Sequence, residues 1–258
     1  MNWELWYTST NDKALDFVRN FRENYNLMGD EVKFTPRIVT WACTSCDAEF
    51  KRKECLSNGR YCAMNHKGTY IQGKDILIED LRQKCLFDIV SKEGKEDQWW
   101  SYIQYVHRMC YEEINENCSK MGHKSIGRAF DATMKCVKSS FDTTSTTEPN
   151  FSKDDNRILK EEADKWKALG SAYWPSIVIN ERTYRGDMVP DTVMTAICSA
   201  FNSEPAYCRQ FREDIGVPLA TTGSGVTRNV LVLIVLFLVI LNVFIILLYR
   251  RCQNRELK

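Results

Sequence analysis

The sequence lacks an excess of either charge. Its 35 Lys and Arg residues stand against 34 Asp and Glu residues, for a formal net charge of +1. A balanced chain gives no reason to expect nucleic acid as a partner. The 258 residues also contain no Gly-rich phosphate loop and no nucleophile motif, which argues against the enzyme classes that depend on them. Histidine is scarce, and its three scattered occurrences are typical of surface or hydrogen-bonded residues rather than catalytic bases: His66, His107 and His123.

The N-terminal stretch MNWELWYTST lacks the basic segment and the apolar stretch of a secretory signal peptide. Two explanations remain open. Either a later hydrophobic segment targets the protein, or the natural start lies upstream in a gene that is represented here by a truncated version or fragment. We favour the second, because the cysteine content described below makes little sense in a reducing cytosol.

A long apolar run is present near the C-terminal end. From Asn229 to Tyr249 there is no charged residue, and Leu, Ile, Val and Phe dominate. A helix of this length spans about 30 Å, the thickness of a bilayer core. A buried core helix is the alternative, but soluble cores rarely need a helix that is apolar all round. We therefore predict a transmembrane helix over 229–249.

The residues that flank this run predict its orientation. Only Arg228 lies close before it, whereas the basic residues that follow are Arg250, Arg251, Arg255 and Lys258. The positive-inside rule places 250–258 in the cytosol as a short tail and everything before the span in a lumen, as in a type I membrane protein. Cys252 would lie beside the membrane, where it is either a palmitoylation candidate or an unmodified thiol.

Ten of the eleven cysteines precede the span, which predicts up to five disulfides in an oxidising compartment. Spacing does not give their connectivity, but Cys198 with Cys208 is the best single pair because it closes a short loop after a helix. Two sequons predict glycosylation at Asn117 and Asn150, the first in competition with pairing of its neighbouring cysteine. The ten residues are Cys43, Cys46, Cys55, Cys62, Cys85, Cys110, Cys118, Cys136, Cys198 and Cys208.

Hydrophobic periodicity predicts the order of elements. Strands are expected at Trp3–Thr8 and, with Pro36 marking an edge, at Val32–Trp41; Asp12 is the expected N-cap of the helix between them. The block from 43 to 64 is cysteine-dense and reads as a loop. Further helices are expected at 74–90, 97–116, 125–139, 157–169 (charged, with a solvated face) and 190–201, with a polar linker at 143–149 and a polar stalk at 209–228.

The stretch YWPSIVINERTYRG completes the pattern with a strand, a turn at 180–182 and a second strand. The order predicts an α/β fold over 1–208: a thioredoxin-like core of the DsbA type with a disulfide-rich helical insertion at about 43–142. In that fold a proline, usually cis, precedes the third strand. We predict a cis bond between Trp174 and Pro175, against a trans proline that simply starts a strand, and expect the bend to offer backbone groups to an extended peptide.

Six segments carry a family resemblance: FTPRIVTW, SNGRYCA, GKDILIEDLRQKC, WWSYIQYV, PSIVINERTYRG and EPAYC. From about Trp3 to Cys208 the sequence resembles the central luminal region of plant-type vacuolar sorting receptors. The resemblance implies a single-span receptor of Golgi, trans-Golgi, endosomal or vacuolar membranes. Such receptors carry soluble cargo to vacuoles, lysosome-like compartments or storage granules. The family also has a protease-associated domain, EGF-like repeats and a tyrosine-based tail motif, none of which this sequence shows.

A thiol oxidoreductase is the rival interpretation, because Cys43 and Cys46 have the spacing of a redox pair. Their place is wrong for it: the pair belongs after the first strand, where this sequence has TSTNDK at 8–13. Structural disulfides are therefore favoured. A zinc cluster made by these two residues with Cys55 and Cys62 fits on spacing alone, but an oxidising lumen disfavours it.

We therefore predict a membrane-anchored binding module, not an enzyme, with no cofactor and no metal. The expected partner is a soluble cargo protein or a sorting-signal peptide; assembly with a longer receptor of the family is an alternative. The predicted cargo surface comprises Trp174 and Pro175 together with Arg60 and Tyr61. Arg60 would either hold a peptide carboxylate or pin its loop to its own backbone. One aromatic group is expected to pack in the core, with a cargo surface as the alternative: Trp99, Trp100, Tyr102 and Tyr105.

Overall fold

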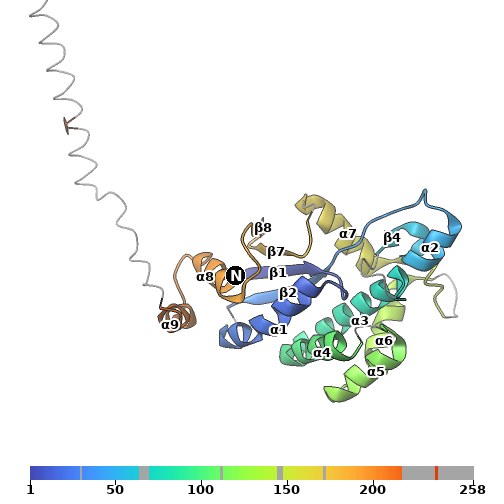
Figure 1. Ribbon diagram of the computed structural model, residues 1–258, viewed down its shortest axis with the longest axis horizontal. Helices are drawn as coiled ribbons and strands as arrows, with labels where there is room; N and C mark the ends of the chain where they lie inside the picture. Colours follow the sequence, from blue (N-terminus) through green and yellow to red (C-terminus); the bar gives the residue numbers. More distant parts are fainter. Residues whose placement is uncertain are drawn as a thin grey trace, which may run out of the picture. The chain divides into compact units, whose positions relative to one another are not determined.

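The computed structural model describes residues 1–29, 31–63, 70–110, 113–143, 148–170, 173–216 and 236–237 (Figure 1). The chain divides into two units, Met1–Cys208 and Arg209–Lys258. Apart from 236–237, the segment 229–249 and Cys252 lie outside the described residues. Within the described ranges, no helix combines the length and apolar character needed to cross a membrane.

A four-stranded mixed sheet forms the centre of the first unit, in the order β2-β1-β7-β8. The central strand β1 is parallel to β2 and antiparallel to β7, and β7 turns back into β8 through Asn180 and Glu181, which both have positive φ. This is the topology that the sequence predicts for a thioredoxin-like core. The strands are β1 (Asn2–Tyr7), β2 (Lys33–Ile38), β7 (Ser176–Ile179) and β8 (Arg182–Thr183).

Side chains alternate along β1 and bury both faces of the sheet. Trp3 is fully buried on the face covered by α1 (Asp12–Leu27), where its ring lies 5.2 Å from that of Phe21. Trp6 belongs to the opposite face and packs against Trp166 of α7 (Arg157–Leu169), with ring centroids 5.1 Å apart. In Figure 1, α1 and α7 lie on opposite sides of the sheet. The last helix of the core, α8 (Pro190–Ser199), packs beside α1.

The start of α1 corrects one prediction. The N-cap is Asn11 rather than Asp12, and its side-chain oxygen accepts the N–H of Ala14 at 3.0 Å. Asn11 and Asp12 are both good N-cap residues, and the sequence alone does not show which of the two has the extended backbone that an N-cap requires.

Pro36 lies on the edge strand β2, as its missing N–H predicts. The outer side of this edge is occupied by side chains. Lys84 donates to the Pro36 carbonyl at 3.3 Å, and the Ile38 N–H donates to the Glu162 carboxylate at 3.3 Å.

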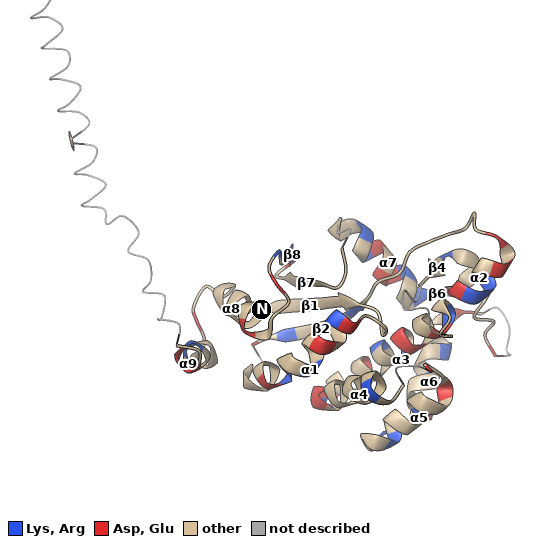
Figure 2. Ribbon diagram, in the orientation of Figure 1, with Lys and Arg blue, Asp and Glu red and all other residues tan. Residues whose placement is uncertain are grey.

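Both predicted aspects of α7 are also present: it runs over 157–169, and Figure 2 shows charges of both signs along it, including the i,i+4 pair of Lys160 with Asp164.

Between β2 and α7 the chain forms the predicted helical insertion (Figure 1). Trp99, Trp100 and Tyr102 of α4 are fully buried, which confirms core packing for these three residues, whereas Tyr105 is half-buried. The elements are α2 (Ala48–Glu54), β3 (Cys55–Leu56), η1 (Ser57–Gly59), β4 (Tyr61–Cys62), α3 (Gly73–Ser91), α4 (Glu96–Met109), α5 (Glu116–Ser125), α6 (Phe130–Ser139), β5 (Phe141–Asp142) and β6 (Asp155–Asn156).

Several predicted boundaries in the insertion are wrong. The block at 43–64 contains a helix and a small hairpin rather than a loop, and α2 escaped prediction because it buries no residue and so has no apolar stripe. The helix expected at 97–116 ends at Met109, since Asn115 caps a separate helix, α5. The helix expected at 125–139 begins only at Phe130, after Gly127 with φ +70°.

A further boundary differs at the end of the core. The stalk predicted at 209–228 begins within a helix, α9, which extends over Ala206–Asp214.

All ten cysteines that precede the apolar run are paired, which confirms the predicted disulfide-rich domain. The one pair predicted by residue, Cys198 with Cys208, is present. The other four disulfides are Cys43–Cys46, Cys55–Cys62, Cys85–Cys136 and Cys110–Cys118.

Candidate functional site

The first predicted site residues, Trp174 and Pro175, lie where β7 begins. Their peptide bond is cis, as predicted. β7 pairs with β1 from Ser176 opposite Trp6, so the bend lies beside the end of the central strand. Tyr173 is 84% exposed and Trp174 is 42% exposed. The bend therefore presents two aromatic side chains to solvent at this end of the sheet.

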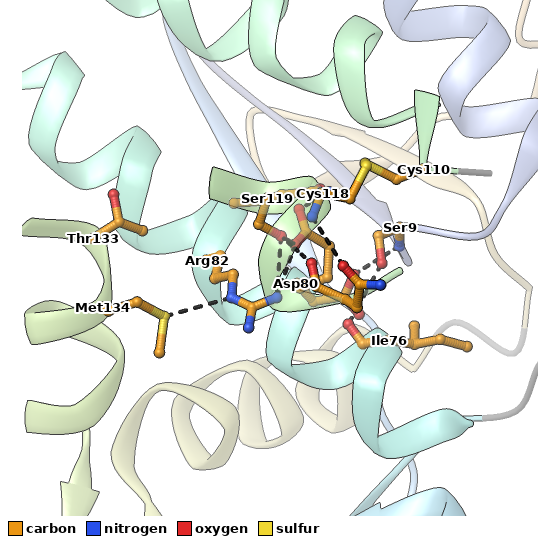
Figure 3. A network of polar contacts seen from close by, with 12 residues as sticks. Ser9, Ile76, Asp80, Arg82, Cys110, Cys118, Ser119, Thr133 and Met134 are labelled. Atoms are coloured by element: carbon orange, nitrogen blue, oxygen red, sulfur yellow. Dashed lines mark hydrogen bonds and ion pairs between the residues drawn. A yellow bond between two sulfur atoms is a disulfide. The ribbon is translucent and has the colours of Figure 1, made fainter. Parts of the chain in front are cut away.

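The loop after β1 lies next to that bend in the register of the sheet, and it contains no cysteine between Thr8 and Asn11. Its Ser9 is buried and held by α3. The Ser9 N–H donates to Asp80 Oδ1 at 2.7 Å, and its hydroxyl donates to the Ile76 carbonyl at 3.4 Å (Figure 3). The place where a thioredoxin-like redox pair belongs is thus occupied by a serine that is anchored to the insertion.

Asp80, on α3, is the acid of this region whose pKa is raised most, and nothing in the sequence around it marks it as a buried residue. It is 3% exposed, and its Oδ2 has no hydrogen-bond partner among the described residues. Burial raises its pKa from 3.8 to about 8, against the lowering effect of the hydrogen bonds from Ser9. The carboxyl group is therefore mostly neutral at pH 7. Because it contacts the backbone of the loop, Asp80 positions the loop rather than offering a charge to a ligand.

Several other buried polar groups of the insertion form a network around Glu79. Glu79 is fully buried, accepts from the Tyr102 hydroxyl at 2.9 Å, and pairs with Arg82 at 3.4 Å. Arg82 also donates to the Ser119 hydroxyl at 3.1 Å and, in Figure 3, reaches the sulfur of Met134 on the other side. A buried charge that is paired and hydrogen-bonded in this way links α3, α4, α5 and α6. We assign this network to the architecture of the insertion.

His123 is the histidine whose surroundings the structure describes in detail. His123 is buried between the Ser119 carbonyl, at 2.8 Å, and the Thr133 hydroxyl, at 2.9 Å, as predicted for a hydrogen-bonded histidine. Burial lowers its pKa, so its neutral form is favoured. His66 lies outside the described residues.

The other predicted site residues, Arg60 and Tyr61, lie at the tip and second strand of the β3–β4 hairpin. Arg60 is largely exposed; its Nε donates to the Ser57 carbonyl at 3.0 Å, and its Nη1 lies 3.1 Å from Asp155 Oδ2. The Tyr61 hydroxyl donates to the other oxygen of Asp155 at 2.8 Å. Burial and this contact raise the pKa of Tyr61. Arg60 thus contacts its own backbone, which was one of its two predicted roles.

The structure brings Arg60 and Tyr61 together on Asp155, whereas Trp174 and Pro175 lie directly before β7. The hairpin tip is shaped by positive φ at Ser57, Asn58 and Gly59. It is held by the segment before β6, through hydrogen bonds from the N–H groups of Ser57 to the Phe151 carbonyl and of Asn58 to the Ser152 carbonyl. The predicted surface therefore consists of two parts that lie on separate elements.

The two sequons differ in their surroundings. Asn117 is exposed on α5, but Ser119 of the same sequon is buried in the polar network, and Cys118 is in a disulfide. Asn150 is exposed in the turn before β6, where its side chain accepts the N–H of Ser152 at 3.1 Å. Of the two predicted glycosylation sites, Asn150 is therefore the more accessible.

The zinc alternative is wrong. Cys43 pairs with Cys46 and Cys55 pairs with Cys62, so none of the four sulfurs remains as a thiolate ligand. Nor do the described residues contain another group of three or more His, Cys, Asp or Glu side chains that could hold a metal ion.

Comparison with known proteins agrees with the thioredoxin-like fold. A family model described as the vacuolar sorting receptor thioredoxin-like domain matches residues 1–198. Vacuolar-sorting receptor 1 of Pisum sativum is 30% identical over 248 residues, which is 87% of this chain and 38% of the receptor. Vacuolar-sorting receptor 7 of Arabidopsis thaliana is 29% identical over 230 residues, which is 81% of this chain and 35% of the receptor. The chain thus spans less than two thirds of the length of these relatives.

Among solved structures, a probable DsbA oxidoreductase from Streptomyces coelicolor has a TM-score of 0.45 and 11% identity, covering 80% of this chain and 92% of that one. The family match is the stronger finding, because it extends over 198 of 258 residues and includes every strand of the sheet. The chain belongs to the vacuolar sorting receptor family through the thioredoxin-like domain of these receptors.

Proposed function

We propose that the chain is a sorting receptor that binds soluble cargo proteins in the lumen of the secretory pathway, for delivery to a vacuole, lysosome or storage granule. The family match over residues 1–198 carries this proposal. The five disulfides support a luminal location, because such bonds persist in oxidising compartments. Under this proposal 229–249 is the membrane anchor and 250–258 is the cytosolic tail, in membranes of the Golgi, trans-Golgi network, endosome or vacuole.

The proposed role is binding rather than catalysis. The named relatives are receptors. At the sheet position where a thioredoxin-like enzyme needs a nucleophilic thiol, this chain has Ser9, and its N–H is bound to a buried carboxyl group. Such a loop has no thiolate to attack a substrate disulfide.

The cargo surface that we propose is centred on the bend at Trp174 and Pro175. The exposed aromatic side chains supply apolar contact area, and the bend at the end of β1 offers backbone groups to an extended segment of cargo. Arg60 and Tyr61 form the second part of the proposed surface. Because Arg60 pairs with Asp155, we expect Arg60 chiefly to hold the hairpin in shape. Its side chain is 44% exposed, and the exposed part is expected to contact cargo carboxylates.

Capture of a reporter tests this assignment. The full chain would be produced in the secretory pathway of cells together with a secreted fluorescent protein that carries a vacuolar sorting signal, and retained and secreted reporter would be measured. Trp174→Ala should reduce retention several-fold, and Arg60→Ala should reduce it less. Met109→Ala removes a 61% exposed apolar side chain from the insertion and serves as the control. Wild-type retention in both test variants, with normal folding, would sink the assignment of this surface.

A further inference from the structure

The Cys43–Cys46 disulfide differs from the others in its exposure. Among the five disulfides of the described residues, it is the one in which neither half is buried, and the two residues between the cysteines are exposed. The other four each contain at least one buried half, and three of them are buried at both ends. A thiolate from solution needs a path to a sulfur atom, so accessibility favours reaction at Cys43–Cys46.

This disulfide also does the least for the fold. Its cysteines are 3 residues apart in sequence, whereas the other pairs are separated by 7, 8, 10 and 51 residues. A disulfide that closes a shorter loop restricts the unfolded chain less. Opening Cys43–Cys46 therefore costs less stability than opening any of the other four.

Hydrogen bonds hold both sides of the loop without the S–S bond. The Cys43 N–H donates to the Gly59 carbonyl at 2.8 Å, and Trp41 exchanges two backbone hydrogen bonds with Cys62, at 3.3 and 2.7 Å. On the other side, Asp47 caps α2 by accepting the Phe50 N–H at 2.8 Å. The two sulfurs are thus carried by a loop whose ends stay in place when the bond between them opens.

An aromatic pair flanks this loop. The ring of Trp41 lies 5.9 Å from that of Phe50, and Trp41 remains 39% exposed. An exposed aromatic surface beside a reactive disulfide gives an apolar side chain of an incoming peptide a place to bind. Neither residue belongs to the loop after β1, so the position is separate from the one that a thioredoxin-like redox pair occupies.

From these observations we infer that Cys43–Cys46 is a thiol-exchange site that accepts electrons from dithiol peptides, with Trp41 and Phe50 as the adjoining contact. A thiolate of the peptide attacks one sulfur of the disulfide, the S–S bond breaks, and the other sulfur leaves as a thiolate. The second thiol of the peptide then displaces the sulfur held in the mixed disulfide. Two electrons and two protons pass to Cys43 and Cys46, and the peptide leaves as a disulfide. This inference does not depend on the proposed receptor function.

Stepwise reduction of the full chain tests the inference. The protein would be made in an oxidising compartment and purified in detergent. After any free thiol, including Cys252, has been blocked, it would be exposed to increasing dithiothreitol and alkylated for mass spectrometry. Cys43 and Cys46 should become alkylated at a reductant concentration at least tenfold below that needed for the other eight. The double variant Cys43→Ser, Cys46→Ser should fold with four disulfides and lose this first step. Simultaneous reaction of all ten, or earlier reaction of another pair, would overturn the inference.

The peptide contact needs its own measurement. A synthetic peptide with two cysteines and a phenylalanine would be compared with its alanine counterpart as the reductant. The phenylalanine peptide should reduce the wild-type protein at least threefold faster. This preference should disappear in Trp41→Ala and persist in Met109→Ala, whose exposed side chain lies on α4. Equal rates for the two peptides on the wild-type protein would refute the aromatic contact and, with it, the peptide as substrate.

Discussion

Replacement of Asp80 by Asn should stabilise the domain and change its dependence on pH. The Asn side chain keeps an oxygen that accepts the Ser9 N–H, now at 2.7 Å from Asp80 Oδ1, and removes the possibility of a charge. The pKa of Asp80 is raised by burial from 3.8 to about 8. Between these values the folded protein holds a proton that the unfolded chain has released. The wild-type free energy of unfolding therefore falls as the pH rises from about 4 to about 8.

The magnitude follows from the same shift. A difference of about four pKa units corresponds to a ceiling of about 6 kcal/mol at about 1.4 kcal/mol per unit. Relaxation around a buried carboxylate lowers this, so we expect Asp80→Asn to be more stable than the wild-type protein by about 2–4 kcal/mol at pH 8. The advantage of the variant should be lost as the pH falls below about 4, where the unfolded chain also takes up the proton. At low pH the neutral Asp80 carries one O–H donor at the Oδ2 position and Asn would carry two N–H donors there, so the variant has no advantage from hydrogen bonding.

The assay is urea unfolding of the disulfide-intact chain, followed by tryptophan fluorescence at several pH values from 4.5 to 8.5. Asp88→Asn on the same helix is the control, since its carboxylate is 44% exposed and pairs with Lys84 at the surface; it should change stability by less than about 0.5 kcal/mol. If Asp80→Asn loses as much stability as the wild-type protein between pH 5 and pH 8, the buried carboxyl is not the source of the pH dependence.

Three further substitutions test the packing with the same unfolding assay. Gly73→Ala would place a methyl group 1.7 Å from a backbone oxygen, so it should cost more than about 3 kcal/mol. As a control, Gly29→Ala meets no atom of the described residues within 4 Å and should be near neutral. Asn11→Ala removes the cap of α1 and should cost about 1 kcal/mol; no change would show that the cap is dispensable. Trp99→Ala empties a fully buried site and should cost about 3–5 kcal/mol, and a loss below about 1 kcal/mol would contradict its place in the core.

The parts of the fold that the sequence predicts are those in which one segment contains its own signal. β1 alternates between two buried faces, so its period of two is visible in NWELWY. The helix at 157–169 has an Asn before it and a Gly after it, and its predicted bounds agree with the structure. The cis bond at Trp174–Pro175 followed from the order of elements, because Pro175 lies directly before the third strand of the sheet.

The parts of the fold that the sequence does not predict either lack a local pattern or depend on contacts between distant segments. α2 buries none of its residues, so no apolar stripe marks it. Cys85 and Cys136 are 51 residues apart, and nothing in their spacing selects that pairing over the alternatives. Asp80 looks like an ordinary polar residue of a helix in GKDILIEDLRQKC; it becomes a buried acid only because α3 lies against the loop that holds Ser9, 71 residues earlier.

The contacts of α3 also explain how the insertion relates to the end of the sheet. Asp80 binds the loop after β1 through Ser9, and Gln83, one turn further on, accepts the hydroxyl of Tyr7 at the end of β1, at 2.7 Å. Both contacts are buried, so water does not compete for them. β1 in turn pairs with β7 next to the bend at Trp174. The insertion and the bend are therefore connected through Tyr7 and Ser9, at the end of β1 and in the loop that follows it.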